Sequence, residues 1–231
     1  MLLAIESSCD DTAVALMTTD GQVVGSLISS QIDAHKVYGG VVPEIASRKH
    51  LASLPLLVQS LLKQAGAGNE DLTAIAVTYA PGLIGSVLIG VNFAKSLAWG
   101  LDLPLIPVDH LEGHLLASFL DHEGFDYPFL GLLASGGHTH LYKVQAFNQY
   151  QLLGKTLDDA MGEAYDKAAK MLGLIYPGGP IVEKLAGLHE GKGAEFTIPL
   201  QGKPTLNFSF SGMKTAFRNH AIKAGIFVEK K

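Results

Sequence analysis

The segment LLAIESSCDDTAVALMTTDGQVVGSLI, residues 2–28, decides the expected fold. Its three apolar runs are residues 2–5, 12–16 and 23–28. The polar segment ESSCDD separates the first two runs, and Asp20-Gly21, a strong hairpin signal, precedes the third. This spacing predicts a meander of three strands.

The segment that follows alternates between helical and extended patterns. Apolar residues at helical spacing predict a helix over residues 43–64, which Pro55 should bend or split in two. A β-rich run at residues 74–79, a largely buried helix at residues 87–99 and a short apolar strand at residues 105–108 come next. This alternation is typical of an α/β layer.

The pattern of the first segment returns at residues 129–144, FLGLLASGGHTHLYKV. An apolar run, a small polar turn and a second strand again follow one another, which predicts two lobes of similar topology. We expect the lobes at residues 1–127 and 128–231, with a polar junction at residues 121–128. Further helices are expected at residues 157–172, from residue 181 and at residues 213–224, and a strand at residues 206–210. The second lobe has less chain than the first, so we expect it to be incomplete.

Composition limits the classes of protein that fit. With 231 residues, of which 48% are hydrophobic and 17% charged, the chain can bury a substantial core. Its formal charge of -5 argues against gripping a nucleic-acid backbone without help from another subunit. A single cysteine, Cys9, and no leader pattern predict a reducing cytoplasm. Pro81-Gly82 interrupts the longest uncharged stretch, residues 72–94, so no membrane span is expected.

The motif HLEGH at residues 110–114 is a candidate metal site. If a helix starts here, His110 and His114 lie at i and i+4 on one face, where two imidazoles can share a metal ion. The alternative is two partly exposed histidines near a helix start. A zincin protease needs its general-base Glu directly after the first His. Leu111 occupies that place and Glu112 follows it, which weakens the protease interpretation.

The turn SGGHT at residues 135–139 is a candidate phosphate or carboxylate site. Glycines let backbone N–H groups approach an anion, and Ser135 and Thr139 would add hydroxyl donors. The alternative is an ordinary tight hairpin. The similar turn between the first two strands favours the phosphate-binding role.

Acidic residues follow in a predicted helix. Asp159, Glu163 and Asp166 are expected on one face, which is either a solvated face or a position from which Asp166 reaches a ribose hydroxyl. The segment PGGP at residues 177–180 then opens a helix whose N-terminus could face the same ligand, or forms a plain turn. Cys9 fits a small residue at a strand end better than a nucleophile.

Seven short motifs occur in order along the chain and together resemble the TsaD family. They are ESSCDDT (6–12), YGGVVPE (38–44), PGL (81–83), HLEGH (110–114), SGGHT (135–139), YPGGP (176–180) and FSFSG (208–212). That family is the catalytic subunit of tRNA threonylcarbamoyladenosine synthase, formerly described as an O-sialoglycoprotein endopeptidase or glycoprotease.

The resemblance implies an α/β fold of the actin/Hsp70/sugar-kinase (ASKHA) class, with two lobes around a cleft. It implies transfer of a threonylcarbamoyl group from threonylcarbamoyl-adenylate to the exocyclic amine of the adenosine beside the tRNA anticodon. His110 and His114 would bind one divalent metal ion per subunit, iron or zinc, that polarises the acyl-phosphate. The adenylate, or ATP, would occupy the cleft. The implied substrate-binding residues are Leu133, Ala134, Ser135, Gly136 and Gly137 for the phosphate and acyl end, and Asp166, Gly179 and Glu183 for the nucleoside.

The resemblance also implies partners. These are tRNA, a paralogous non-catalytic TsaB-like subunit, a TsaE-like ATPase and a TsaC-like enzyme that makes the adenylate, all in the cytoplasm and without a membrane. Family members continue past residue 231 and carry there a third metal ligand, an Asp, and an adenylate-contacting Asn, so we expect this chain to be C-terminally truncated. Two alternatives stay open: a non-catalytic scaffold of the same fold that binds its complex through residues 43–64, and a metalloprotease.

Overall fold

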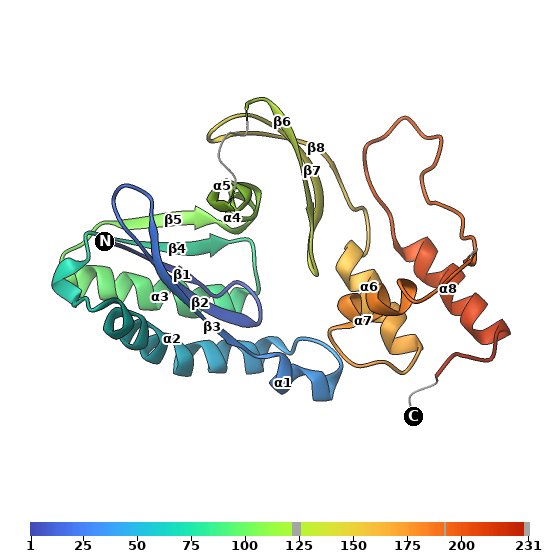
Figure 1. Cartoon of the computed structure of the whole chain (residues 1–231), viewed down its shortest axis with the longest axis horizontal. Helices are drawn as coiled ribbons and strands as arrows, with labels where there is room; N and C mark the ends of the chain where they lie inside the picture. The colour runs from blue at the N-terminus through green and yellow to red at the C-terminus, as the bar shows by residue number, and fades with distance from the viewer. Residues whose placement is uncertain (122–125, 192, 229–231) are drawn as a thin grey trace. The chain divides into compact units, whose positions relative to one another are not determined.

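The computed structural model describes residues 1–121, 126–191 and 193–228 (Figure 1). The chain forms two compact units, Met1–Gly113 (unit 1) and His114–Lys231 (unit 2), and the division falls within helix α4 (His110–Leu116). Residues 122–125 of the expected junction lie outside the described residues. The lobe boundaries expected from the sequence, 1–127 and 128–231, stay a prediction.

Unit 1 contains a five-stranded sheet in the order β3-β2-β1-β4-β5. Its strands are β1 (Leu2–Glu6), β2 (Asp11–Met17), β3 (Val23–Ser30), β4 (Ala74–Ala80) and β5 (Leu105–Asp109). Strands β1 to β3 pair antiparallel, which confirms the predicted meander. Strands β1, β4 and β5 run parallel, so their carboxyl ends meet at one edge of the sheet.

Helices α2 (Pro43–Ala65) and α3 (Ile84–Leu101) cover one face of this sheet (Figure 1). Alternate strand residues point into the core between them, as the period of two requires. The core includes Leu3, Ile5, Val14, Leu16, Ile75 and Val77 from the sheet, Leu54, Val58 and Leu61 from α2, and Ala94 and Ala98 from α3. Each buried leucine contributes roughly 1.5–3 kcal/mol. Leu54, Val58 and Leu61 pack on the core on either side of Pro55, and the helix is not split.

Helix α3 differs from the expected largely buried helix. It packs its small residues Gly90, Ala94 and Ala98 toward the sheet, but Ile84 is 88% exposed and Trp99 89% exposed. Among the described residues, α3 is the one helix long and apolar enough to cross a membrane. Length and composition alone are weak evidence for a span.

Gly66 ends α2 in the left-handed region, at φ 63°. Gly66→Ala is expected to destabilise unit 1 by about 1 kcal/mol, because an L-residue is strained there. Gly100, near the end of α3, has no such φ, and a Cβ there meets open space. Gly100→Ala should therefore stabilise by about 0.5–1 kcal/mol. Chemical denaturation measures both, and effects of the same sign would contradict this account.

Unit 2 contains a three-stranded antiparallel sheet in the order β6-β7-β8. Its strands are β6 (Phe129–Ala134), β7 (Thr139–Ala146) and β8 (Gln149–Lys155), and its helices are α5 (Ser118–Asp121), α6 (Met161–Met171), α7 (Gly178–Ala186) and α8 (Ser211–Lys223). Strand β8 was not expected from the sequence. Short helical turns in unit 1 complete the described elements: α1 (Ile32–His35), η1 (Lys36–Tyr38) and η2 (Asn69–Asp71).

The strand predicted at residues 206–210 is wrong. Phe208 forms only an isolated bridge with Thr156. The N–H of Lys155 donates to the side-chain Oδ1 of Asn207 at 3.0 Å rather than to a backbone carbonyl. Because a side chain takes the place of the main chain at this rung, the ladder does not continue.

Candidate functional site

The turn between β6 and β7 closes on itself through residue Ser135. The N–H of Ser135 donates to the carbonyl of His138 at 2.8 Å, and the N–H of His138 donates to Ser135 Oγ at 3.1 Å. The two glycines between them are exposed. Within the described residues, the N–H groups of Gly136 and Gly137 have no hydrogen-bond acceptor. The turn is therefore a tight hairpin that also presents two consecutive backbone donors to its surroundings.

Neither backbone conformation nor packing within the described chain requires glycine at these two positions. Gly136 and Gly137 do not have a φ in the left-handed region, and a Cβ built on either meets open space. Glycine elsewhere in the chain has an evident cause: a Cβ on Gly90, for example, would lie 2.1 Å from Ser7 Oγ. Glycine can also be required where a ligand approaches the main chain closely, and the open turn has room for such a ligand.

Thr139 of the motif and the nearby Leu133 are buried within unit 2. Thr139 is 2% exposed, and its Oγ1 accepts the N–H of Met161 at 2.9 Å, so its hydroxyl oxygen supports the start of helix α6. Leu133 is buried, and its side chain lines a cavity of about 200 Å³ together with His114, Leu115 and Phe119. Ala134 is exposed.

Helices α6 and α7 bring together the residues expected to contact a nucleoside. Asp166 Oδ1 accepts the N–H of Gly178 at 2.7 Å, and a Cβ on Gly178 would lie 2.4 Å from the Cβ of Ala169. This contact fixes the start of α7 against α6. Gly179 and the exposed Glu183 are one turn apart on α7, and a Cβ on Gly179 would meet open space. Asp166, Gly179 and Glu183 thus belong to one packed helix pair.

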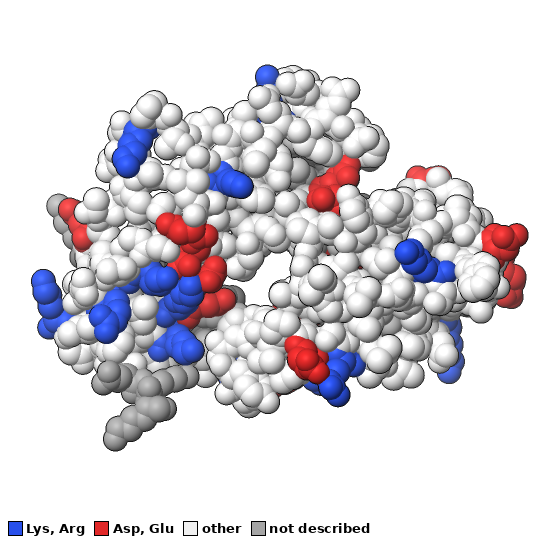
Figure 2. All heavy atoms as spheres, turned by 180° about the vertical axis from the view of Figure 1, so that it is seen from behind, with Lys and Arg blue, Asp and Glu red and all other residues white. Residues whose placement is uncertain are grey.

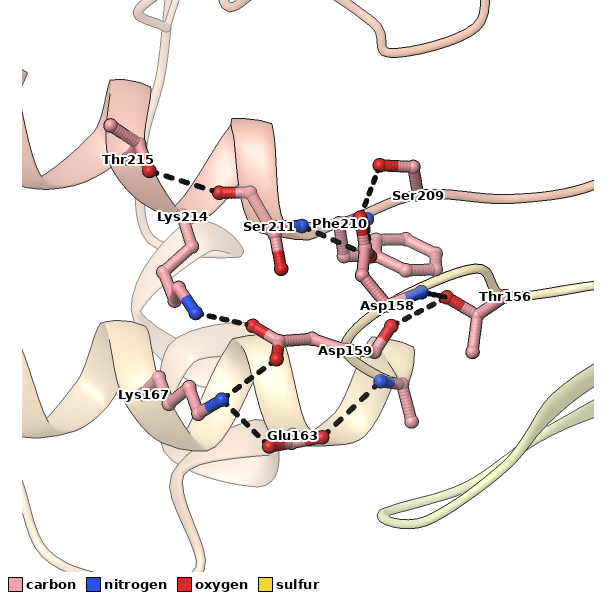
Figure 3. A network of polar contacts seen from close by, with 11 residues as sticks. Thr156, Asp158, Asp159, Glu163, Lys167, Ser209, Phe210, Ser211, Lys214 and Thr215 are labelled. Atoms are coloured by element: carbon pink, nitrogen blue, oxygen red, sulfur yellow. Dashed lines mark hydrogen bonds and ion pairs between the residues drawn. The ribbon is translucent and has the colours of Figure 1, made fainter.

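The expected acidic row does not lie on one helix face, because α6 begins only at Met161. Asp158 instead caps α8: its Oδ1 accepts the N–H groups of Phe210 at 2.7 Å and Ser211 at 3.2 Å, and its Oδ2 accepts from Ser209 Oγ at 2.6 Å (Figure 3). These bonds supply acceptors to the unsatisfied first turn of the helix. The role of Asp158 is structural.

The carboxylate of Asp159 forms salt bridges with two lysines of unit 2. Its Oδ1 lies 2.8 Å from Lys167 Nζ and its Oδ2 2.6 Å from Lys214 Nζ, while Glu163 Oε1 lies 2.6 Å from Lys167 Nζ (Figure 3). Burial raises the pKa of Asp159. The hydrogen bonds from both lysines lower it by a larger amount, so the pKa is lowered overall. Figure 2 shows acidic and basic side chains lying next to one another in this part of the chain. The carboxylates of Asp159 and Glu163 are consequently neutralised by lysines within the fold.

His110 opens α4, and Asp109 caps that helix by accepting the N–H of Leu111 at 2.8 Å. The predicted helical spacing of His110 and His114 is therefore confirmed. His110 Nδ1 lies 3.2 Å from Glu6 Oε2 and 3.2 Å from Ser8 Oγ. An ionised carboxylate can only accept, so Nδ1 carries the proton and the lone pair of the neutral ring is on Nε2.

Glu6 is held as a carboxylate. Thr78 Oγ1 donates to Glu6 Oε2 at 2.5 Å, and the N–H of Ser8 donates to Oε1. Burial raises the pKa of Glu6, but the hydrogen bonds from His110, Ser8 and Thr78 lower it by more, to about 2. A carboxylate that orients an imidazole in this way is the usual support of a metal-binding histidine.

The arrangement excludes a serine nucleophile relay at this place. Such a relay binds Ser to one ring nitrogen and the acid to the other, whereas Ser8 and Glu6 both contact Nδ1 of His110. Cys9 is no better a nucleophile. Partial burial of the thiol, followed by the charges of Asp10 and Asp11, raises its pKa to about 12.

A divalent metal fits α4 in part. His110 and His114 supply two imidazoles at the spacing of one helical turn, and Glu6 fixes the first of them. In the ranges that the structure describes, no group of three His, Cys, Asp or Glu side chains gathers around a common point. His110 and His114, with Glu6 behind the first of them, therefore stay a predicted pair of metal ligands.

Sequence reasoning missed Glu6, Ser8 and Thr78. Their signal was available: Glu6 ends β1, Thr78 lies near the end of β4, and His110 follows β5. The carboxyl ends of parallel strands meet at one edge, which is where ligands of α/β sheets bind.

Comparison with known proteins identifies the family of the chain. A family model described as "TsaD: tRNA N6-adenosine threonylcarbamoyltransferase" matches residues 22–230. A relative from Geobacter sp. (strain M21), named tRNA N6-adenosine threonylcarbamoyltransferase, is 51% identical over 223 residues, which are 96% of this chain and 65% of the relative. A relative of the same name from Syntrophotalea carbinolica is 49% identical over 221 residues, 96% of this chain and 64% of the relative. The chain spans about two thirds of the length of these curated relatives.

Solved structures bear on the fold. Component A of (R)-2-hydroxyglutaryl-CoA dehydratase from Acidaminococcus fermentans is similar with a TM-score of 0.55 at 11% identity, over 99% of this chain and 70% of that chain. Together with the 3-2-1-4-5 strand order, this likeness confirms the ASKHA-type α/β fold. Since the family model covers nearly the whole chain and the relatives share about half of its residues, the chain belongs to the TsaD family.

Proposed function

We propose that this chain carries the acyl-transfer site of a tRNA N6-adenosine threonylcarbamoyltransferase. The exocyclic amine of a tRNA adenosine attacks the carbamoyl carbon of threonylcarbamoyl-adenylate. A C–N bond forms, the C–O bond to the phosphate breaks, AMP leaves, and the amine loses one proton. The substrate is an acyl-phosphate, so the site must hold a phosphate and an adenosine together.

The observation that carries this proposal is the pair of exposed backbone donors at Gly136 and Gly137. Consecutive backbone N–H groups are a common means of binding phosphate oxygens, and the two at Gly136 and Gly137 have no acceptor within the described chain. The absence of a Cβ lets the ligand approach the main chain. Ser135 and Ala134 form the wall of this turn, and Leu133 anchors it in the core.

Asp166, Gly179 and Glu183 suit the nucleoside. One oxygen of Asp166 is bound to the N–H of Gly178, which holds the carboxylate still while its other oxygen can accept a ribose hydroxyl. Gly179 leaves open space at the start of α7, and Glu183 follows one turn later.

The metal belongs to the same proposal. His110 and His114 would hold iron or zinc as two of its ligands, with Glu6 keeping the lone pair of His110 on Nε2. When bound, the metal supplies a Lewis acid for the acyl-phosphate oxygens. Glu6 and Ser8 contact Nδ1 of His110, and Thr78 in turn holds Glu6, so the orientation of the ring is supported from behind.

We propose that the chain works with other proteins in the cytoplasm: a paralogous TsaB-like subunit, a TsaE-like ATPase and a TsaC-like adenylate-forming enzyme. Helices α2 and α3 expose Leu51, Leu56, Ile84 and Trp99, large apolar side chains of the kind that protein partners cover. The net charge of -5 fits a tRNA that is gripped largely by other subunits.

The test is transfer to unmodified tRNA by the chain with these partners, read as modified adenosine and released AMP. We expect transfer by the wild type and, for Gly136→Val, loss of transfer and of adenylate binding without a fall in the unfolding temperature. Gly100→Ala is the control that should retain activity. Absence of transfer, both by this chain and by one extended to the length of its relatives, would overturn the proposal.

A further inference from the structure

The first turn of α6 is fastened to both ends of the glycine turn. The N–H of Gly162 donates to the carbonyl of Ser135 at 3.1 Å, and the N–H of Met161 donates to Oγ1 of Thr139 at 2.9 Å. Ser135 precedes the glycine pair and Thr139 follows it. The first donors of the helix, which in many proteins bind an anion directly, are thus used to hold the turn.

Gly162 allows this contact because the approach leaves no room for a side chain. A Cβ there would lie 2.7 Å from the carbonyl oxygen of Ser135, 2.8 Å from Gly136 Cα and 2.9 Å from Gly136 N. All three are main-chain atoms, which no side-chain rotation can move away. The φ of Gly162 lies outside the left-handed region, so proximity and not conformation demands glycine.

Thr139 holds the other end of the glycine turn against α6. Its side chain is buried, and its carbonyl accepts the N–H of Thr156 at 2.9 Å, which ties the end of β8 to the turn. A buried hydroxyl that satisfies a helix N–H cannot be removed without leaving that donor unpaired. Both sides of the glycine pair are therefore fixed to well-packed elements.

Helix α6 also carries Asp166, one turn after Gly162 and on the same face. The helix thereby links the turn that offers Gly136 and Gly137 to the carboxylate expected at the ribose. A change at Gly162 would shift the phosphate-binding end relative to the nucleoside-binding end.

We infer that Gly162 and Thr139 are positioning residues that set the distance between the phosphate and nucleoside subsites, so that the site prefers a nucleoside 5′-monophosphate over the nucleoside alone. This inference rests on the proposed function. It goes beyond it in assigning substrate selection to two residues that face the turn from behind and do not touch the ligand.

The test compares AMP, which has both the phosphate and the nucleoside, with adenosine, which has only the nucleoside. In Gly162→Ala we expect AMP binding to weaken by about tenfold or more, the effect of a lost hydrogen bond to a charged group, and adenosine binding by less than about twofold. Thr139→Val should behave likewise, and Thr139→Ser, which keeps the oxygen, should restore the preference for AMP. Calorimetry on the full chain measures both ligands.

Gly212→Ala is the matched control. Gly212 is the second residue of α8, as Gly162 is of α6, but a Cβ there meets only Pro199 Cγ at an ordinary 3.6 Å. It should leave both affinities unchanged. If the ratio of AMP affinity to adenosine affinity in Gly162→Ala equals that of the wild type, the positioning role is wrong, but the proposed binding site is not contradicted. If the wild type binds neither ligand, the proposed function fails and the inference fails with it.

Discussion

Replacing Asp159 with alanine is expected to lower the free energy of unfolding of unit 2 by about 2 kcal/mol. The side chain is 13% exposed and accepts from Lys167 and Lys214, which are 37% and 25% exposed. Removing the carboxylate leaves two ammonium groups close together; within the part of the chain that the structure describes, Lys167 keeps a second carboxylate partner, Glu163, and Lys214 does not. Because the lysines are partly hydrated, the loss is smaller than for a fully buried pair. Hydrogen exchange of peptides from α6 and α8 measures it locally.

Acid provides an independent measurement of the same network. The pKa values of Asp158 and Asp159 are lowered in the folded chain from an ordinary 3.8. Their contribution to stability is therefore fully present above pH 3.8 and disappears as the pH falls through the lower folded-state values. Asp159→Ala should show a shallower acid loss than the wild type.

Asp33→Ala is the control for the Asp159 substitution, because the ion pair of Asp33 with Lys36 has a similar distance of 2.5 Å but lies on the surface. It should change neither hydrogen exchange nor unfolding measurably. Equal effects of the two substitutions would contradict the structural role of Asp159.

Glu6→Gln is expected to weaken metal retention by roughly 10- to 100-fold, the usual effect of altering the carboxylate behind a metal-binding imidazole. Glu6 Oε2 fixes the proton of His110 on Nδ1, and an amide holds that proton more weakly. His110→Ala removes the ligand itself and should lose more. The metal bound after dialysis against a chelator, read by elemental analysis, measures each variant without reference to activity.

Glu112→Gln separates this interpretation from the metalloprotease. Glu112 is on α4 between the two histidines, and a protease would need it as a general base. In a threonylcarbamoyltransferase the substitution should leave metal retention and transfer at wild-type levels. Chelator-sensitive cleavage of a glycoprotein that disappears in both His110→Ala and Glu112→Gln would favour the protease instead.

Local patterns in the sequence were enough to predict most elements. The meander of β1 to β3 followed from three apolar runs and the Asp20-Gly21 turn, and α2 from apolar residues at helical spacing. The prediction was least accurate where a side chain replaced the main chain. Asn207 occupies a rung that a strand would have used, and Asp158 caps a helix that starts 53 residues later.

The candidate site was predictable in its parts and not in its connections. The glycine turn and the histidine pair are short motifs, which a single sequence displays. The hydrogen bond between Glu6 and His110 joins residues 104 positions apart. It forms because β1, β4 and β5 are parallel and their carboxyl ends meet at one edge of the sheet. The close approach of Gly162 to Ser135 depends likewise on how α6 packs, which no local spacing reveals.

Because a Cβ at Gly136, Gly137 or Gly179 would meet open space, the measured stability of a variant there does not predict whether ligand binding is lost. Alanine there strains nothing in the folded chain and narrows the freedom of the unfolded one. A variant screen based on expression level or heat resistance would score such changes as neutral or favourable. If the proposed function is right, only a screen that includes the ligand would recognise them as damaging, so inherited or engineered changes at these three glycines should be judged by binding.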